Sequence, residues 1–352
     1  MSFERTILVT GGYGFIGSHF VRLCLQKGCR VINLDALTYA ASQATLKDIE
    51  KGELHYHFQK GQIQDRDLVR SLFSKFKPSM VVNFAAETHV DRSIDSPRPF
   101  IDTNVVGAFA LLEESRNYYN ALTPEEKEEF KFLHISTDEV FGSCPGDAYK
   151  EDASYNPSSP YAASKASADL LIKSFYHTYN FPILITNCTN NYGPYQFPEK
   201  LIPLMIIRVL QGQSLPIYGN GMQIRDWLYV QDHVEAIWGV LQGGKKGNTY
   251  NIPGLNGEVP NKVVVEEICS IFDTMIPRQN NASYKDLITY VSDRPGHDFR
   301  YALDIEKIKK NIRWYPKVNF KEGLKKTVAW YLENQWWWQE ILDRGYQAER
   351  LG

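Results

Sequence analysis

Short apolar runs alternate with amphipathic segments through the first half of the chain. The runs that predict buried strands are Thr6–Thr10, Arg30–Leu34, His55–Phe58, Met80–Ala86 and Phe130–Ser136. Between and after them, apolar residues recur at helical spacing from Ile16 towards Gly28, over Asp65–Phe76, over Phe100–Arg116 and over Tyr161–Tyr179. This alternation is typical of a parallel sheet with right-handed crossovers and helices on both faces. The sequence therefore predicts an α/β protein with a doubly wound Rossmann sheet.

The pattern becomes less regular in the second half. Pro- and Gly-rich connections separate short strands such as Leu215–Tyr218 from helices such as Asn261–Met275. We interpret residues 1–190 as a Rossmann domain that carries the catalytic residues, and residues 191–352 as mainly a smaller α/β lobe, with the chain free to cross back between them. In open α/β sheets, ligands bind at the carboxyl ends of the strands. The site is therefore expected at that edge, with the smaller lobe closing over it.

Composition narrows the functional classes. Of the 352 residues, 43% are hydrophobic and 23% are charged, which is ordinary for a folded globular protein. The formal net charge of −2 provides no basic surface for nucleic acid. The five cysteines form no Cys-x-x-Cys or Cys/His pattern, which predicts reduced thiols and no metal site. Without a membrane-length apolar run or a signal-peptide pattern, we expect a cytoplasmic protein with no membrane partner.

A glycine-rich segment follows the first predicted strand. Thr10–Gly17 reads TGGYGFIG and joins that strand to the first predicted helix. Glycines permit a tight turn, and the free N–H groups at a helix N-terminus bind pyrophosphate. A glycine triplet alone also occurs in plain turns. Here, however, Asp35 ends the second strand, where a carboxylate accepts hydrogen bonds from the adenosine ribose. Because an acid there repels the 2′-phosphate of NADP, we predict NAD.

Tyr161 and Lys165 lie one helical turn apart and therefore on one helix face. A phenol with its ordinary pKa of about 10 is a poor base at neutral pH, and a nearby cation favours the phenolate. Such pairs are common on protein surfaces. Downstream of a dinucleotide-binding turn, the pair instead indicates a catalytic base and its partner.

Two adjacent carboxylates follow the fifth predicted strand. Asp138 and Glu139 come directly after Thr137. Two acids in a loop are commonly only solvated, but at the carboxyl end of a central strand they would point into the site. Close carboxylates push each other's pKa values apart, so that one serves as an acid and the other as a base. The sequence alone does not say which is which.

These motifs resemble the extended short-chain dehydrogenase/reductases, and the adjacent carboxylates resemble those of the dTDP-glucose 4,6-dehydratases. Sugar epimerases of the same superfamily usually carry small or apolar residues at these two positions. The resemblance covers nearly the whole chain. It implies Tyr161 as base, Lys165 as the bridge to the nicotinamide ribose, and Thr137 as the hydroxyl that binds the reacting oxygen. It assigns the acid to Asp138 and the second base to Glu139.

The resemblance also implies the ligand contacts. The residues implied for NAD are Gly11, Gly12, Gly14, Phe15, Ile16, Gly17, Asp35, Ala36, Leu37, Thr38, Gln62, Ile63, Phe84, Ala85, Ala86, Thr103, Tyr161, Lys165 and Asn191. Those implied for the nucleotide sugar are Thr88, Thr137, Asn190, Lys200, Leu201, Pro216, Ile217, Tyr218, Arg225, Asn261, Arg294, His297 and Tyr346, the last together with Gln347. A guanidinium suits this ligand because its planar fork matches phosphate oxygens.

Two residues depart from the family pattern. Gln62 stands where an Asp usually contacts adenine, which keeps a hydrogen-bonding group but loses its charge. Phe141 replaces a common Tyr and so removes a hydroxyl beside the two carboxylates. His89 also falls near the predicted site. We assign it a structural role, because the mechanism already has its acid and its bases.

The resemblance implies dehydration of dTDP-glucose to dTDP-4-keto-6-deoxy-glucose, a step of deoxysugar biosynthesis. Tyr161 would take the C4 hydroxyl proton, Glu139 the C5 proton, and Asp138 would protonate the departing C6 hydroxyl, with NAD holding the hydride in between. UDP-glucose as substrate, a nucleotide-sugar 4-epimerase, and a non-catalytic NAD-binding protein are the alternatives; the intact catalytic set argues against the last. The helices over Phe100–Arg116 and Tyr161–Tyr179 resemble those of a four-helix dimer interface, which implies a homodimer.

Overall fold

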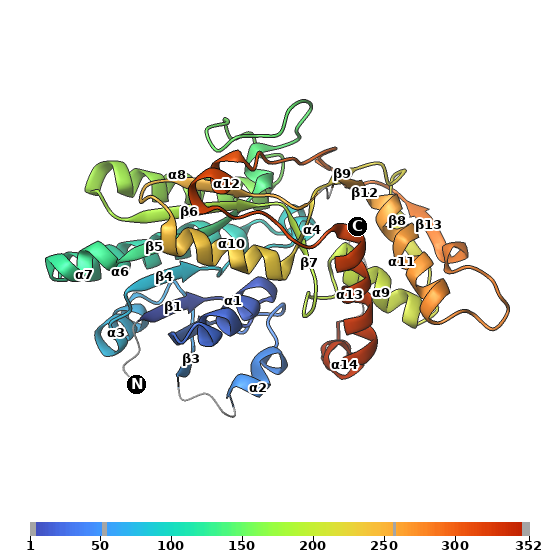
Figure 1. The fold of residues 1–352 in the computed structure, drawn as a ribbon, viewed down its shortest axis with the longest axis horizontal. Helices are drawn as coiled ribbons and strands as arrows, with labels where there is room; N and C mark the ends of the chain where they lie inside the picture. The colour runs from blue at the N-terminus through green and yellow to red at the C-terminus, as the bar shows by residue number, and fades with distance from the viewer. Residues whose placement is uncertain (1–4, 51–54, 256–257, 347–352) are drawn as a thin grey trace.

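In the computed structural model, which describes residues 5–50, 55–255 and 258–346, a parallel sheet of seven strands runs through the larger part of the molecule (Figure 1). The strands are β1 Thr6–Thr10, β2 Arg30–Asp35, β3 Tyr56–Lys60, β4 Met80–Asn83, β5 Lys131–Thr137, β6 Ile183–Cys188 and β11 Thr249–Ile252. Their order is β11-β6-β5-β4-β1-β2-β3, so the chain reverses its direction of travel between β1 and β4. Ligand crevices of open α/β sheets lie at such a reversal. The predicted doubly wound Rossmann sheet is confirmed.

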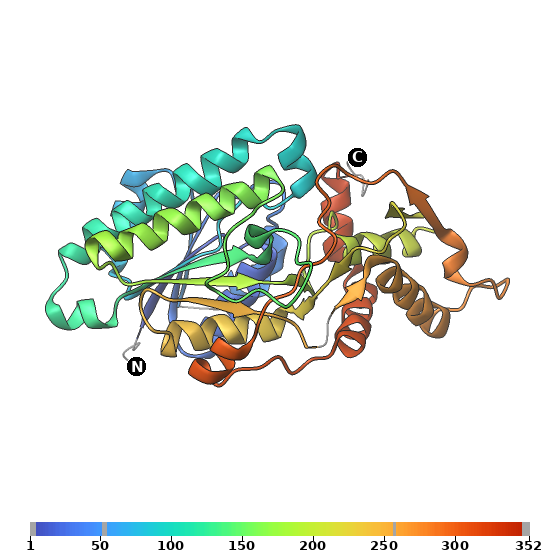
Figure 2. The same ribbon diagram turned by 90° about the horizontal axis from the view of Figure 1, so that it is seen from above.

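Helices cover both faces of the sheet (Figure 2). One face carries α3 Arg66–Phe76, α6 Ala108–Asn120 and α8 Pro160–Tyr179, and the other carries α1 Phe15–Gln26, α10 Val230–Gly243 and α12 Glu306–Ile312. Alternate residues of β1 serve the two cores: Leu8 packs in the core with α3, α6 and α8, whereas Ile7 and Val9 pack in the core with α1 and α10. Burial on both faces explains why the central strands β1 and β4 are nearly continuous apolar runs.

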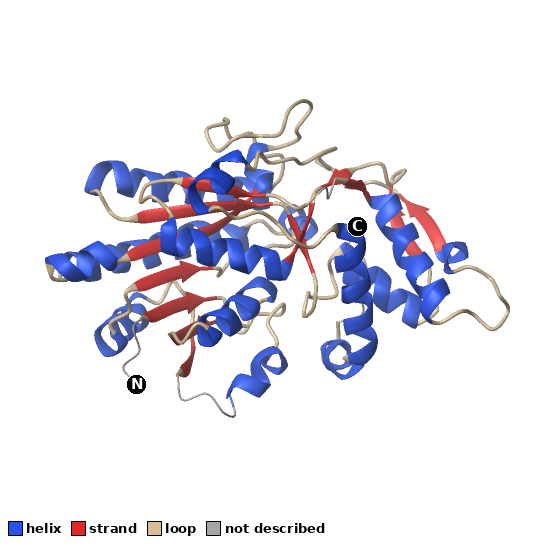
Figure 3. Ribbon diagram, viewed as in Figure 1, coloured by secondary structure: helices blue, strands red, loops and turns tan. Residues whose placement is uncertain are grey.

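A smaller lobe packs beside the carboxyl edge of the sheet (Figure 3). Its helices are α9 Leu201–Leu210, α11 Asn261–Met275, α13 Phe320–Glu333 and α14 Gln335–Asp343. Its strands form three short pairs: β7 Asn190–Tyr192 with β10 Trp227–Tyr229, β8 Leu215–Tyr218 with β13 Ile288–Val291, and β9 Ile224–Arg225 with β12 Val259–Pro260. The four helices share a hydrophobic core of their own, which includes Trp337 and Trp338. Within the described residues, no helix is long and apolar enough to span a membrane.

Several short helices connect these elements. They are α2 Lys47–Glu50, α4 Val90–Asp95, α5 Arg98–Phe100, α7 Pro124–Glu129 and the 3-10 turns η1 Gln43–Leu46, η3 Asp138–Phe141 and η4 Tyr284–Leu287. The helix α4 begins at His89, whose Nδ1 accepts a hydrogen bond from the Arg92 N–H. A ring nitrogen therefore satisfies one of the free N–H groups at this helix start, in accord with the structural role predicted for His89.

Two predicted elements differ from the structure. The strand predicted over Met80–Ala86 ends at Asn83, and the residues after it form a loop instead. The single helix predicted over Phe100–Arg116 is α5, a π-helical stretch η2 over Ile101–Gly107, and α6. Within η2, Asn104 is buried and binds both backbone groups of Glu87 and the Ser164 hydroxyl, at 2.8–2.9 Å. Such local widening is common at functional sites, and here it anchors the loop after β4 to α8.

The sequence pattern did not predict β6 or β11. β6 reads ILITNC and β11 reads TYNI, so polar residues interrupt both apolar runs. The side-chain amides of the two buried asparagines have backbone partners: Asn187 donates to the Thr137 carbonyl at 2.9 Å, and Asn251 donates to the Tyr149 carbonyl at 2.8 Å. A buried amide is stable in a strand when it has partners, and such partners are invisible in a local sequence window. Through β11, the chain returns to the central sheet after entering the smaller lobe.

Candidate active site

The turn between β1 and α1 is closely packed. Gly11 has φ of +71°, and a Cβ added to it would lie 2.8 Å from the Ala85 nitrogen. A Cβ on Gly17 would lie 2.2 Å from the Gly11 carbonyl oxygen. Both positions therefore require glycine, and the turn brings the N-terminus of α1, with its free N–H groups, to the edge of a cavity. The donor set fits the pyrophosphate of a dinucleotide.

Asp35 is held in place at the end of β2. Its two carboxylate oxygens accept hydrogen bonds from the N–H groups of Tyr13, at 2.9 Å, and Leu37, at 2.7 Å. Leu37 adopts a left-handed φ of 54°, and this uncommon conformation accompanies the turn that aims its N–H at the carboxylate. Burial raises the pKa of Asp35 to about 6, opposed by the hydrogen bond from Leu37. The carboxylate is thus fixed at the cavity wall, where a ribose can reach it.

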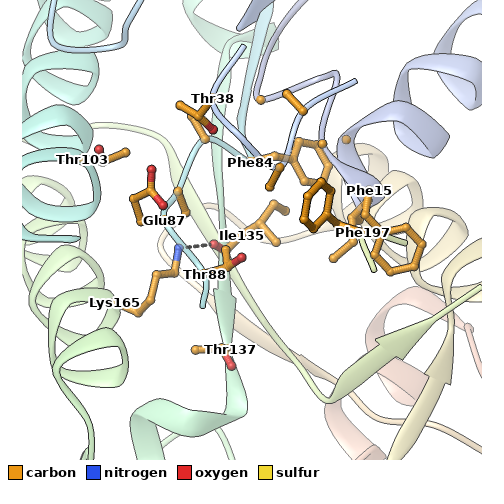
Figure 4. A pocket seen from close by; sticks show the side chains of 18 of the residues that line it. Phe15, Thr38, Phe84, Glu87, Thr88, Thr103, Ile135, Thr137, Lys165 and Phe197 are labelled. Atoms are coloured by element: carbon orange, nitrogen blue, oxygen red, sulfur yellow. Dashed lines mark hydrogen bonds between the residues drawn. The ribbon is translucent and has the colours of Figure 1, made fainter. Parts of the chain in front are cut away.

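A cavity of about 330 Å³ lies along the carboxyl ends of β1, β2, β4, β5 and β6 (Figure 4). The predicted site residues that line it are Gly11, Gly14, Phe15, Ile16, Gly17, Asp35, Ala36, Thr38, Gln62, Ile63, Phe84, Ala85, Ala86, Thr88, Thr103, Thr137, Asp138, Glu139, Tyr161, Lys165, Asn190, Asn191 and Lys200. Gly12 does not line it and donates its N–H to Asn33 Oδ1 at 3.0 Å. Leu37 faces a neighbouring cavity.

The two carboxylates leave β5 inside the 3-10 turn η3. Thr137 caps this turn: its hydroxyl accepts from the Glu139 N–H at 3.3 Å and donates to Asp138 Oδ1 at 3.1 Å. Asp138 is buried, and its Oδ2 has no hydrogen-bond partner among the described residues. Burial and the Glu139 charge raise the pKa of Asp138 well above its usual range. Burial also raises the pKa of Glu139, but the charges of Arg294, Arg225 and Lys200 oppose that increase.

Tyr161 and Lys165 face the same cavity from the first turns of α8. The helix begins at Ser159, whose hydroxyl accepts from the Ala162 N–H, with Pro160 in the first turn. Lys165 Nζ donates to the Ile135 carbonyl at 2.7 Å (Figure 4). Burial lowers the pKa of Lys165 to about 8, while burial and the Glu139 charge raise that of Tyr161 well above its ordinary value. The protein alone therefore keeps the phenol protonated, although we expected the lysine to favour the phenolate.

A buried polar network behind Lys165 was not predicted. His134 on β5 lies 3.4 Å from Lys165 Nζ and 3.0 Å from the Asn83 amide, and its other neighbour is Asp169 at 3.7 Å. Asp169 accepts from the hydroxyls of Ser136, at 2.7 Å, and Tyr155, at 3.0 Å. One signal was available in the sequence, because Asp169 follows Lys165 by one helical turn. The histidine could not be found by spacing, since it belongs to a different element.

The remaining predicted contacts lie in the smaller lobe, outside the cavity lining. They are Leu201 at the start of α9, Pro216, Ile217 and Tyr218 on β8, Arg225 on β9, Asn261 at the start of α11, and Arg294 and His297 in the loop after β13. Arg225 stacks 4.4 Å above the Tyr301 ring and donates to the Asp298 carbonyl at 3.0 Å. Tyr346 packs on Phe197, 5.1 Å between ring centroids, while Gln347 lies outside the described residues.

Glu87 and Glu199 also line the cavity and were not singled out by the sequence patterns. The Glu199 side chain is 3% exposed, and burial raises its pKa, opposed by the charges of Lys200 and Arg92. Its carboxylate lies 3.7 Å from His89 Nε2. Burial and the Lys200 charge lower the pKa of His89 to about 3, so this ring is neutral at neutral pH. Glu199 is therefore a further buried acid of the site.

Tyr161 and Lys165 lie on α8, the helix before β6, and face the glycine turn after β1 across the cavity. Asp35, the acid expected to bind the ribose, lines the same cavity from the end of the neighbouring strand β2. This is the arrangement of the extended short-chain dehydrogenase/reductases, and the chain is a member of that class.

Comparison with known proteins narrows the class to a family. Residues 8–327 match the family model described as GDP-mannose 4,6 dehydratase. The dTDP-glucose 4,6-dehydratase of Xanthomonas campestris pv. campestris (strain B100) is 52% identical over 349 residues, which cover 99% of both chains. The dTDP-glucose 4,6-dehydratase of Bacillus anthracis, solved in complex with NAD, is 43% identical with a TM-score of 0.85, covering 96% of this chain and 99% of that one. The chain belongs to the dTDP-glucose 4,6-dehydratase family.

More distant structures share the fold. The UDP-glucose 4-epimerase of Thermotoga maritima, solved with UDP-glucose, is 28% identical with a TM-score of 0.82, over 94% of this chain and 99% of that one. The architecture is therefore common to dehydratases and epimerases. What separates the two activities must be argued from the side chains of the site.

Proposed function

We propose that the protein catalyses the NAD-dependent dehydration of dTDP-glucose to dTDP-4-keto-6-deoxy-glucose. The observation that carries this proposal is the pair of adjacent carboxylates, Asp138 and Glu139, which share one cavity with Tyr161 and Lys165. Loss of water across C5 and C6 needs a base for the C5 proton and an acid for the C6 hydroxyl. A 4-epimerase needs neither. Similarity to dTDP-glucose 4,6-dehydratases over nearly the full chain supports the same conclusion.

The residues that would hold NAD are the glycine turn, the N-terminus of α1 and Asp35, and their packing fits such a group. When bound, NAD supplies a hydride acceptor for C4 and later a hydride donor for C6. Tyr161 takes the proton of the C4 hydroxyl, with the Thr137 hydroxyl beside the same oxygen. Lys165 is placed on the same helix face to bind the ribose of the cofactor.

The pKa values of the two carboxylates support their assigned roles. Asp138 is the more strongly perturbed group, and burial keeps it protonated and able to donate to the departing C6 hydroxyl. Glu139 has three cations within electrostatic reach, which favour its ionised form. The ionised group can remove the C5 proton, which a C4 ketone makes acidic, and a proton returns to C5 when the hydride is delivered to C6. Neighbouring carboxyl groups with separated pKa values commonly divide acid and base work in this way.

The proposal is tested with the purified, NAD-loaded protein and two substrates, dTDP-glucose and UDP-glucose. We expect loss of one water from dTDP-glucose, detected by mass spectrometry and by the absorbance of the 4-keto product in alkali, with no net accumulation of NADH. Conversion of the glucose to a sugar of equal mass would instead identify a 4-epimerase. Preferential turnover of UDP-glucose would support the same dehydration but identify UDP-glucose as the substrate.

NAD affinity is expected to depend on pH through Asp35. The pKa of this carboxyl is about 6 in the folded protein, so it is ionised at pH 8 and becomes protonated as the pH falls through 6. Because charge-assisted hydrogen bonds to ribose need the carboxylate, we expect the dissociation constant for NAD to rise by up to about tenfold per pH unit below 6. Calorimetric titrations at pH 5–8 measure this. Asp35→Asn should bind more weakly and lack the pH dependence; an unchanged profile in that variant would exclude Asp35 as the cause.

We also propose that two copies pair through α6 and α8, which lie side by side on one outer face of the sheet (Figure 2). Large apolar side chains are exposed on this face, among them Val106 at 51% and Leu170 at 59%. Contiguous exposed apolar residues mark interaction surfaces, and a twofold axis would bring the two helix pairs together as a four-helix bundle.

Leu170→Glu is expected to shift the protein from dimer to monomer, because a carboxylate buried in the interface has no partner. Light scattering after size exclusion gives the mass directly. Tyr315→Glu is the matched control, because Tyr315 is 60% exposed and follows α12, which packs on the opposite face of the sheet. A monomeric wild-type protein, or a dimer that persists in Leu170→Glu, would rule out this interface.

We further propose a cytoplasmic location, which fits five buried free thiols and is tested by cell fractionation.

A further inference from the structure

One carboxylate joins the Rossmann side of the cavity to the smaller lobe. Asp91 lies in the first turn of α4, and both of its oxygens are occupied by residues more than a hundred positions away. Oδ1 accepts from Arg294 Nη1 at 2.9 Å, and Oδ2 accepts from the Tyr218 hydroxyl at 3.1 Å. The two partners come from separate elements of the smaller lobe, the loop after β13 and the strand β8. Asp91 therefore fixes these two elements relative to each other and to α4.

The contact is largely removed from solvent. The side chains of Arg294 and Asp91 are 18% and 13% exposed. Burial tends to raise the pKa of Asp91, but the hydrogen bond and charge of Arg294 outweigh it, and the pKa lies below its usual range. Asp91 is accordingly ionised at neutral pH. A partly buried ion pair with a direct hydrogen bond holds its geometry better than an exposed pair.

Arg294 keeps an unused donor. Its Nε is buried and has no hydrogen-bond acceptor among the described residues. A guanidinium binds oxyanions through such donors in a planar fork, and a buried donor without an acceptor is energetically unfavourable. Because Asp91 binds Nη1, the guanidinium of Arg294 is held in one orientation, and its Nε remains available to donate to another acceptor. The same electrostatic neighbourhood contains Arg225 and Lys200, which together with Arg294 act on Glu139.

We propose that Asp91 is a positioning residue for the diphosphate group of the nucleotide sugar, acting through Arg294 and Tyr218. It orients the guanidinium so that Nε can donate to a phosphate oxygen, and it connects the smaller lobe to residues 87–92 beside the cavity. Lys200 Nζ makes a second tie to this segment, to the Thr88 carbonyl at 2.8 Å. This inference rests on the proposed function for the identity of the ligand.

The first test is binding of dTDP to the NAD-loaded protein by calorimetry. We expect Asp91→Ala to weaken dTDP binding about tenfold, as loss of one ordered charged contact predicts. Asp91→Glu, which keeps the charge, should recover part of the affinity. Asp95→Asn is the matched control, because Asp95 is an exposed acid on the same helix. Wild-type affinity in Asp91→Ala, or tighter binding through lost charge repulsion, would overturn the proposal.

The second test asks whether Asp91 acts through Arg294. In an Arg294→Lys background, Asp91→Asn should have little further effect on dTDP affinity, because residues that act through one another are not additive. Equal effects of Asp91→Asn in both backgrounds would contradict the inference. In turnover assays, KM for the nucleotide sugar should rise much more than kcat falls, since the diphosphate is bound alike in the ground and transition states. If Asp91 had only a structural role, its replacement would lower the melting temperature without this difference between the effects on KM and kcat.

The binding arm separates this inference from the function on which it rests. If wild-type protein fails to convert dTDP-glucose while Asp91→Ala still weakens dTDP binding, the proposed reaction is wrong and the positioning role stands. If conversion occurs and dTDP binds Asp91→Ala as it binds wild type, the reaction stands and the positioning role is wrong.

Discussion

Replacing Asp138 by Asn and Glu139 by Gln together is expected to stop loss of water from the sugar while oxidation at C4 continues. The amides keep the shape and hydrogen bonds of the carboxyl groups, but they transfer no proton. General acid–base groups typically contribute about 10²–10⁴-fold to a rate, and here both are removed from one step. Because oxidation no longer leads to elimination, reduced cofactor should accumulate on the protein and be visible at 340 nm when dTDP-glucose is added.

The single variants divide the two roles. With substrate deuterated at C5, Asp138→Asn should still release deuterium to solvent, because Glu139 remains as the base. Glu139→Gln should retain it. The reverse result would exchange the assignments of acid and base. Asp147→Asn is a control in the same loop region, since Asp147 is exposed and does not line the cavity. Turnover of the double variant at the wild-type rate would show that neither carboxylate takes part in the mechanism.

The sequence predicts the parts of this site that follow one another along the chain. Gly11–Gly17, Asp35 and the Thr137–Glu139 run each follow a buried apolar strand, and parallel strands bring their carboxyl ends to one edge. Tyr161 and Lys165 share a helix face by their spacing. These are local rules of period and turn chemistry, and the structure gathers all of these residues except Gly12 and Tyr13 around one cavity.

What the sequence does not predict depends on contacts between distant segments. His134 reaches Lys165 from a neighbouring strand, and Arg294 reaches Asp91 across 203 residues. No spacing in the chain encodes such pairs. The pKa of Tyr161 is a further example. The nearby lysine was visible in the sequence, but the burial that outweighs its charge depends on how α4, α5 and η3 pack against α8. The direction of a pKa shift in a closed cavity is therefore a property of the tertiary structure.

Tyr161→Phe is expected to block the reaction one step earlier than the double carboxylate variant. Without the phenol, no group accepts the C4 hydroxyl proton, so we expect turnover to fall by about 10²–10⁴-fold and no reduced cofactor to appear at 340 nm. Burial raises the pKa of Tyr161, and positive charge beside the phenol favours its base form. The oxidised nicotinamide would bring that charge, and Lys165 would add to it on moving from the Ile135 carbonyl to the ribose.

Tyr155→Phe is the matched control for this prediction. It removes the same hydroxyl from a nearby tyrosine that binds Asp169 and Lys173 behind the cavity, without lining it. Affinity for dTDP should be unchanged in Tyr161→Phe, because the phenol is assigned to the sugar and not to the nucleotide. If Tyr161→Phe accumulates reduced cofactor as the double carboxylate variant does, another group takes the C4 proton, and Glu139 becomes the candidate. If only the carboxylate variant accumulates it, oxidation and elimination are separate steps with separate proton acceptors, as the geometry of the cavity predicts.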